Sequence, residues 1–79
     1  MARGDPPDPQ LAALLRELRT SPDRSQEAVA HAAGLTVAAY GRIERGQADP
    51  SWTSVVGIAD VLGVSLAELG KRFDQRRTA

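Results

Sequence analysis

Apolar residues recur along this chain at the spacing of α-helices. The first stretch carries four leucines at i, i+3, i+4 and i+7, the spacing of one buried helical stripe: Leu11, Leu14, Leu15 and Leu18. Asp8 precedes the stretch as a helix N-cap, and Pro9 suits the first helical position. A helix is therefore predicted from Pro9 to Arg19 or Thr20.

Hydroxyl side chains and glycines divide the rest of the chain into four further short helices. The predicted N-caps are Ser25, Thr36, Ser51 and Ser65, and the predicted stops are Gly34, Gly46 and Gly63. The helices are expected over residues 26–33, 36–45, 51–62 and 66 to about 73, the last opened by a capping box of Ser65 and Glu68. The inner stripe expected for residues 51–62 is Trp52, Val55, Ile58, Ala59 and Leu62. No stretch alternates like a strand, so the predicted fold class is all-α with five helices.

The second and third helices are separated by only about three residues around Gly34, which forces a sharp turn and is typical of a helix-turn-helix. At 100° per residue the third helix has two faces. The large apolar side chains Tyr40 and Ile43 share the face expected in the core. The other face holds small side chains and two arginines: Val37, Ala38, Gly41, Arg42 and Arg45. This slim cationic face suits the DNA major groove, about 12 Å wide. The alternative is that it receives another protein helix, although two unpaired arginines would be costly to bury.

Composition narrows the class of protein. A chain of 79 residues makes one small domain, and without cysteine it has neither disulfides nor thiolate metal sites. No apolar run approaches a membrane span and no signal peptide is evident, so a soluble, cytoplasmic protein is expected. Residues 1–7 are expected to form a disordered arm, 8–73 the helical domain and 74–79 a basic tail.

The formal net charge is zero, but the charges are segregated along the chain. Residues 24–47 hold three arginines and two acids, residues 49–68 hold three acids and no base, and residues 71–77 hold four bases and one acid. Arginine supplies nine of the ten bases, and its planar fork suits bidentate contacts to guanine or phosphate. Ordinary solvated faces would give the same counts, so this distribution permits a nucleic-acid partner without requiring one.

A combination of motifs within residues 24–69 carries a family resemblance. The motifs are S-Q-E-x-x-A, A-G-L, I-E-R-G, a proline shortly afterwards and L-G-V-S. Together they resemble the Xre-type helix-turn-helix family, the relatives of phage Cro and repressor proteins and of restriction-modification controller proteins. The resemblance implies a compact lambda-repressor-like fold of five helices, with the third helix in the major groove and the second across the DNA backbone.

The resemblance also implies which residues contact DNA. They are Arg24, Ser25, Gln26, Thr36, Val37, Ala38, Arg42, Arg45 and Gln47. Gln26 is expected at a phosphate, Arg42 at a guanine edge, and Arg45 and Gln47 at phosphates. Val37 and Ala38 suit thymine methyl groups, although plain surface residues would look the same. Gln26 as a simple polar first-turn residue also stays open.

Three further positions carry structural expectations. In this family an arginine near the end of the first helix pairs with an acid in the third, which predicts an ion pair between Arg19 and Glu44. Arg24 stands where the family usually has an apolar residue, so the entry to the second helix is expected either to be looser or to offer a phosphate contact. Tyr40 needs a hydroxyl partner if buried, and Gly41 either permits close approach to DNA or is tolerated.

A single small DNA-binding domain is expected to bind an operator weakly, so a homodimer on palindromic double-stranded DNA is the leading hypothesis. The expected dimer residues are Trp52, Val56, Val61, Leu66 and Phe73, each of which could equally be ordinary core. The alternative is a helix-turn-helix module or antitoxin that binds a protein. No cofactor, small-molecule ligand or membrane is expected. A lone His31 does not indicate a metal site, and no constellation indicates an enzyme.

Overall fold

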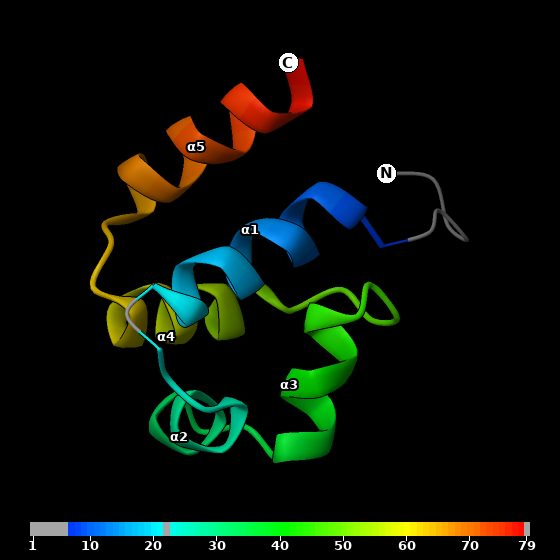
Figure 1. Cartoon of the computed structure of the whole chain (residues 1–79), viewed down its shortest axis with the longest axis vertical. Coiled ribbons are helices and arrows are strands. Elements are labelled where there is room, and N and C mark those ends of the chain that lie inside the picture. The colour runs from blue at the N-terminus through cyan, green and yellow to red at the C-terminus, as the bar shows by residue number, and fades with distance from the viewer. Residues whose placement is uncertain (1–6, 22, 79) are drawn as a thin grey trace.

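The computed structural model describes residues 7–21 and 23–78, which form five α-helices (Figure 1). In chain order they are α1 (Pro9–Thr20), α2 (Gln26–Ala32), α3 (Val37–Glu44), α4 (Trp52–Leu62) and α5 (Leu66–Thr78). The described ranges contain no strand, so the predicted all-α class is confirmed. Of the expected N-terminal arm only Pro7 lies within these ranges.

All five predicted N-caps are present. In each, the side-chain oxygen accepts a hydrogen bond from a backbone N–H two or three residues later, at 2.8–3.0 Å. These bonds satisfy one of the donors that every helix start leaves unpaired, which is why short polar residues stand at these positions: Asp8, Ser25, Thr36, Ser51 and Ser65. The second half of the capping box is not formed, because the Glu68 carboxylate instead accepts from Arg72 Nε at 2.8 Å.

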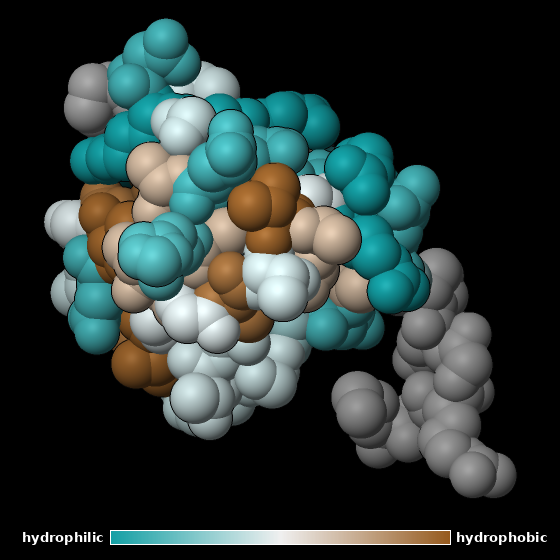
Figure 2. Space-filling view, turned by 90° about the horizontal axis from the view of Figure 1, so that it is seen from below, coloured by the Kyte–Doolittle hydropathy of each residue, from teal (hydrophilic) through white to brown (hydrophobic). Residues whose placement is uncertain are grey.

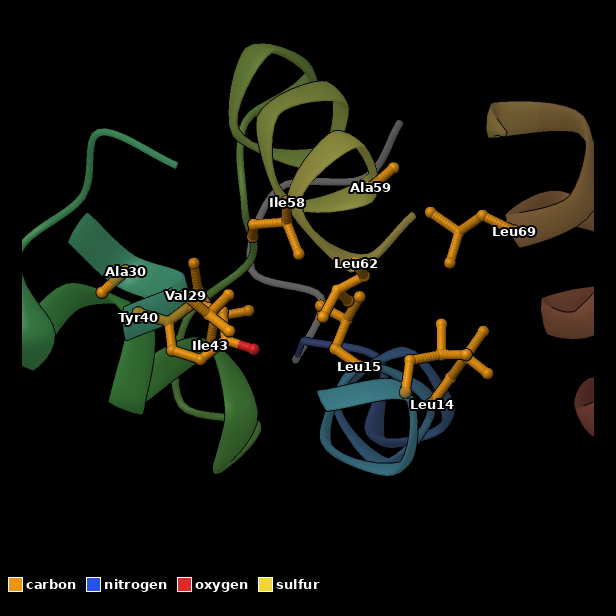
Figure 3. Close-up of a cluster of buried hydrophobic side chains, with 11 residues drawn as sticks. Leu14, Leu15, Val29, Ala30, Tyr40, Ile43, Ile58, Ala59, Leu62 and Leu69 are labelled. Carbon is orange, nitrogen blue, oxygen red and sulfur yellow. The ribbon is translucent and has the colours of Figure 1, made fainter. Parts of the chain in front are cut away.

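The core gathers buried apolar side chains from all five helices (Figure 3). Leu14 and Leu15 of α1 are almost fully buried, as are Val29 of α2, Tyr40 of α3 and Ile58 of α4. Burial of side chains of this size is the main favourable term for so small a domain. The core therefore fixes the helix-turn-helix against α1 and α4.

The prediction that Trp52 lies on the inner stripe of α4 was wrong, because 69% of the residue is exposed. Trp52 is the first residue of α4, directly after the N-cap. From this end of the helix its side chain reaches past the core and borders a surface groove. Ile58, Ala59 and Leu62 are buried as expected.

The predicted end of the fifth helix near Phe73 was also wrong, because α5 continues through residues 74–78 that were expected to form a tail. Pairs within the helix hold this extension: Arg77 with Asp74 at 3.2 Å, and Arg72 with Glu68 one turn earlier. Arg76 Nη1 also donates to Glu17 Oε2 on α1 at 2.6 Å. The helix is thus extended partly by a contact across 59 positions of sequence.

The helices are placed so that α3 and α5 lie at opposite ends of the molecule, with α1 between them (Figure 1). Within the described ranges, no single helix is long and apolar enough to span a membrane. Only α4 and α5 taken together pass that test, and they are bent by 100° relative to each other.

Candidate nucleic-acid interface

A four-residue turn joins α2 to α3. Gly34 has φ +76°, a left-handed conformation that side-chain-bearing residues rarely adopt, and this residue breaks the path of α2. Leu35 N then donates to Ala30 O at 2.8 Å, which closes the end of α2, and Thr36 caps α3. The two helices pack directly against each other. This arrangement is a helix-turn-helix.

The two faces expected for α3 are present. Tyr40, Ile43 and Glu44 are buried, whereas Val37, Ala38 and Arg42 are exposed. Arg45, the C-cap, is exposed as well. A slim, solvent-facing surface with two long cationic side chains therefore runs along the outside of this helix. Figure 2, which views the molecule from the side of α2 and α3, shows pale and apolar residues at the centre of this face and hydrophilic residues around much of it.

Gly41 was expected on the outer face of α3, where it either permits close approach to DNA or is tolerated, but it does not reach the surface. It is buried, because the Arg45 side chain folds back over it. A Cβ at position 41 would lie 2.9 Å from Arg45 Nη1. The missing side chain therefore makes room for the Arg45 guanidinium. Arg45 Nε also donates to Gln47 Oε1 at 3.3 Å, so these two candidate phosphate ligands lie together at the end of α3.

Arg42 is set apart from the other arginines of the described ranges. The guanidinium groups of all the others make a hydrogen bond or ion pair to a carboxylate, a backbone carbonyl or a side-chain amide. Arg42 alone among them makes neither. All of its donors are therefore free for a partner outside the chain.

Two of the three candidate DNA-binding residues at the start of α2 already make hydrogen bonds within the protein. Gln26 is half-buried, and its Nε2 donates to Glu44 Oε1 at 3.1 Å. Arg24 is half-buried, with Nη1 3.2 Å from Leu18 O at the end of α1. Arg24 therefore occupies the position that the family usually fills with an apolar residue, and its side chain folds back against the end of α1. Ser25 is exposed and serves as the N-cap.

Arg19 and Glu44 form the expected ion pair, and it is bidentate. Arg19 Nε lies 2.6 Å from Glu44 Oε2 and Nη2 lies 3.0 Å from Oε1, with the two side chains 14% and 2% exposed. Arg19 Nη1 also donates to Arg24 O at 2.6 Å. Glu44 therefore links α1 and α3 directly, and α2 through Gln26. Sequence reasoning missed the Gln26 contact, because a polar first-turn residue gives no sign of which carboxylate lies beside it.

This network shifts the ionisation of its members. Burial alone would raise the pKa of Glu44, but hydrogen bonds from Arg19, with Tyr40 and Gln26 close by, outweigh it and lower that pKa below its ordinary value. The hydrogen bond to Glu44 likewise raises the pKa of Arg19 despite burial. Burial and the adjacent carboxylate raise the pKa of Tyr40, whose hydroxyl has no well-aligned hydrogen-bond partner in the described ranges. The pair is therefore fully charged at neutral pH.

The expected dimer residues fall into two groups. Trp52, Leu66 and Phe73 come together at an apolar groove of about 310 Å³ between α1, α4 and α5. Its lining is completed by Leu11, Val55, Leu69 and Gly70. Val56 and Val61 are half-buried and lie outside the groove lining. The exposed fractions of Trp52 and Leu66, 69% and 39%, leave an apolar surface facing solvent on this side.

His31 is exposed. In the described ranges no group of three or more histidine, cysteine or acidic residues is arranged to hold a metal ion.

Solved structures with the same fold are regulators. The restriction-modification controller protein C.AhdI from Aeromonas hydrophila is 36% identical over 77% of this chain and 92% of its own, with a TM-score of 0.73. A mutant of the controller protein C.Esp1396I is 20% identical, covering 90% of this chain and 95% of its own with a TM-score of 0.84. The clp gene regulator ClgR from Corynebacterium glutamicum is 22% identical over 85% of this chain and 71% of its own, with a TM-score of 0.79. At these lower identities the last two show the fold alone.

A search of curated protein sequences found no match. The sequence profile of a family described as a helix-turn-helix domain matches residues 10–71, which include all of α1 to α4 except Pro9. The chain thus belongs to the helix-turn-helix domain family, and its fold is that of the Xre-type DNA-binding transcription regulators.

Proposed function

We propose that this protein is a sequence-specific regulator that binds a palindromic operator in double-stranded DNA as a homodimer. The observation that carries the proposal is the outer face of α3, where Arg42 projects from a surface of small side chains and makes no hydrogen bond or ion pair with residues 7–21 or 23–78. A helix of this profile enters the major groove without obstruction, and arginine is the side chain best suited to guanine there. The 36% sequence identity with a restriction-modification controller protein supports a small regulator of the same kind that acts in the cytoplasm.

Base contacts are assigned to the start and middle of α3. Arg42 is assigned to the O6 and N7 atoms of a guanine, a pairing worth roughly 1–3 kcal/mol of discrimination. Val37, with 45% of the residue exposed, and Ala38 are placed against thymine methyl groups. Thr36, the exposed N-cap of α3, lies beside them.

Phosphate contacts are assigned to the two ends of the helix-turn-helix. At the end of α3 they come from Arg45 and Gln47, which are already held together. At the start of α2 they come from Arg24, Ser25 and Gln26. An amide nitrogen carries two hydrogens, so Gln26 can donate one to Glu44 and the other to a phosphate. Such contacts fix the register of the protein on DNA without reading its sequence.

The apolar groove is the proposed dimer surface. Trp52 and Leu66 expose apolar area on this side of the molecule, and the groove beside them offers a complementary hollow. A dimer with its two-fold axis through this region presents two copies of α3 to DNA. Each copy binds one half-site, and the half-sites lie about 10–10.5 bp apart or a multiple of that spacing. Val56 and Val61 are assigned to the rim.

Selection of bound sequences from a random DNA pool tests the proposal. The expected result is an inverted repeat with a half-site spacing near one helical turn, or a multiple of it, and a guanine in each half-site whose preference disappears in Arg42→Ala. Arg72→Ala is the matched control, because Arg72 is an exposed arginine of α5 at the far end of the molecule. Binding that ignores DNA and salt but retains a protein partner would instead indicate a protein-binding module.

A further inference from the structure

Arg16 lies on α1, outside the helix-turn-helix, and its side chain is exposed. Its Nη1 lies 3.5 Å from the carbonyl oxygen of Glu44, the last residue of α3. Arg19, about one turn later, binds the Glu44 carboxylate, and Ala12, one turn earlier, lies beside Gly46, where an added Cβ would be 3.9 Å from the Ala12 Cβ. These three residues at i, i+4 and i+7 form one stripe of α1 that faces the end of α3.

Ion pairing distinguishes the two ends of the molecule. Each arginine of α5 is paired with a carboxylate: Arg72 with Glu68, Arg76 with Glu17 and Arg77 with Asp74. Within the described ranges the exposed arginines without a carboxylate partner are Arg16, Arg42 and Arg45. Exposed arginines without a carboxylate partner therefore gather at α3 and on the adjoining stripe of α1, whereas on the described part of α5 only Lys71 among the basic residues lacks such a partner.

We propose that Arg16 binds a DNA phosphate beside the contact assigned to Arg45 and Gln47, which extends the interface from the helix-turn-helix onto α1. The inference rests on the proposed function. Arg45 directly follows Glu44 in the chain, so the Arg16 guanidinium borders the same end of α3. Its one hydrogen bond to the described residues is at the outer limit of hydrogen-bond length and uses one of five N–H donors, so four remain for phosphate oxygens.

A simpler role predicts a different outcome. A cation near the C-terminal end of a helix is favoured by the helix dipole, so Arg16 could serve α3 alone. In that case its loss would lower thermal stability and leave DNA binding of the folded protein unchanged. A phosphate contact is sequence-independent, and each one neutralised contributes about 0.9 to the slope of log affinity against log salt concentration.

The test compares Arg16→Ala and Arg16→Gln with wild type and with Arg72→Ala, on the selected operator and on random duplex DNA across a salt series. Arg16→Gln keeps most of the stem and serves if the alanine variant folds poorly. Both Arg16 variants are expected to lower the salt slope by about 1.8, because the homodimer loses one phosphate contact in each half-site, and to weaken binding to the two DNAs by the same factor. The base preference is expected to stay unchanged, and Arg72→Ala to match wild type. Ethylation of single operator phosphates should show one interfering position per half-site that disappears in Arg16→Gln.

The outcomes separate this inference from the proposed function. An unchanged salt slope and an unchanged ethylation pattern in folded Arg16→Gln, with loss of base preference in Arg42→Ala, would overturn the role of Arg16 and keep the function. Wild-type protein that binds no DNA would overturn both. A change of base preference in the Arg16 variants would contradict a phosphate contact.

Discussion

At the scale of single residues, the Glu44 carboxylate joins three helices through hydrogen bonds. It accepts from Arg19 of α1 and Gln26 of α2, while Glu44 itself lies on α3. Breaking one partner of a buried ion pair leaves the other charge without compensation, which is why such losses are much larger than those of surface pairs. The Arg19–Glu44 pair thus holds the helix-turn-helix against α1.

Replacing Glu44 by glutamine is expected to lower the free energy of unfolding by about 3–5 kcal/mol, because Arg19, whose side chain is only 14% exposed, stays charged beside a neutral group. Urea denaturation followed by circular dichroism measures the change. Glu68→Gln is the matched control, since Glu68 pairs with Arg72 on the surface of α5, and it should unfold like wild type. Equal midpoints for the two variants would contradict the role of Glu44.

The low pKa of Glu44 also predicts how stability depends on pH. A carboxyl group whose pKa is lower in the folded than in the unfolded state stabilises the fold at pH values above its unfolded value, 4.5. That contribution is lost as the pH falls below 4.5 towards the folded pKa, because protons then bind the unfolded chain more strongly. Unfolding curves measured between pH 7 and pH 3 should show this loss, and in Glu44→Gln the dependence should be shallower. Identical slopes in the two proteins would count against the assignment.

At the scale of helices, the sequence was sufficient to predict those features that depend only on residues close together in the chain. The N-caps and the leucine stripe of α1 were all predicted, because they depend on residues within one or two turns. The end of α5 and the exposure of Trp52 were not predicted. The first involves Arg76 meeting Glu17 across 59 positions in addition to the local pair of Arg77 and Asp74, and the second depends on where α4 starts relative to the core. The outer face of α3 was predicted from its period, but the fold of Arg45 over Gly41 was not.

Gly41 offers a test at this scale. Alanine at position 41 gains about 1 kcal/mol of helix propensity, and its Cβ would meet only the far end of the flexible Arg45 side chain. We therefore expect Gly41→Ala to raise the melting temperature while displacing the Arg45 guanidinium, so that DNA affinity falls and base preference is kept. Gly34→Ala is the contrasting variant, since its φ of +76° strains any side chain despite open space around it, and it should lower the melting temperature. A destabilised Gly41→Ala would mean that Arg45 cannot move.

At the scale of the whole molecule, α3 and the apolar groove belong to different parts of the surface. The groove residues come from α1, α4 and α5, and none of them comes from α3. A second copy bound at the groove therefore leaves the outer face of α3 free.

Replacing Trp52 by glutamate is expected to dissociate the proposed dimer, because a charge placed in an apolar interface loses its hydration without a partner. With 69% of Trp52 exposed in the single chain, the fold itself should be little affected. Sedimentation equilibrium measures the mass, and circular dichroism checks the fold. Thr53→Glu, also exposed on the first turn of α4 but outside the groove lining, is the control. A wild-type protein that sediments as a monomer at every concentration would contradict the dimer.

The residues of α3 that hold the helix in the fold are different from those on its outer face. The buried residues Tyr40, Ile43 and Glu44 hold the helix in place, whereas Val37, Ala38 and Arg42 contribute almost nothing to the core. Substitutions at those three surface positions are nearly free of folding constraints. A new operator preference can therefore arise by exchanging a few side chains on an unchanged scaffold.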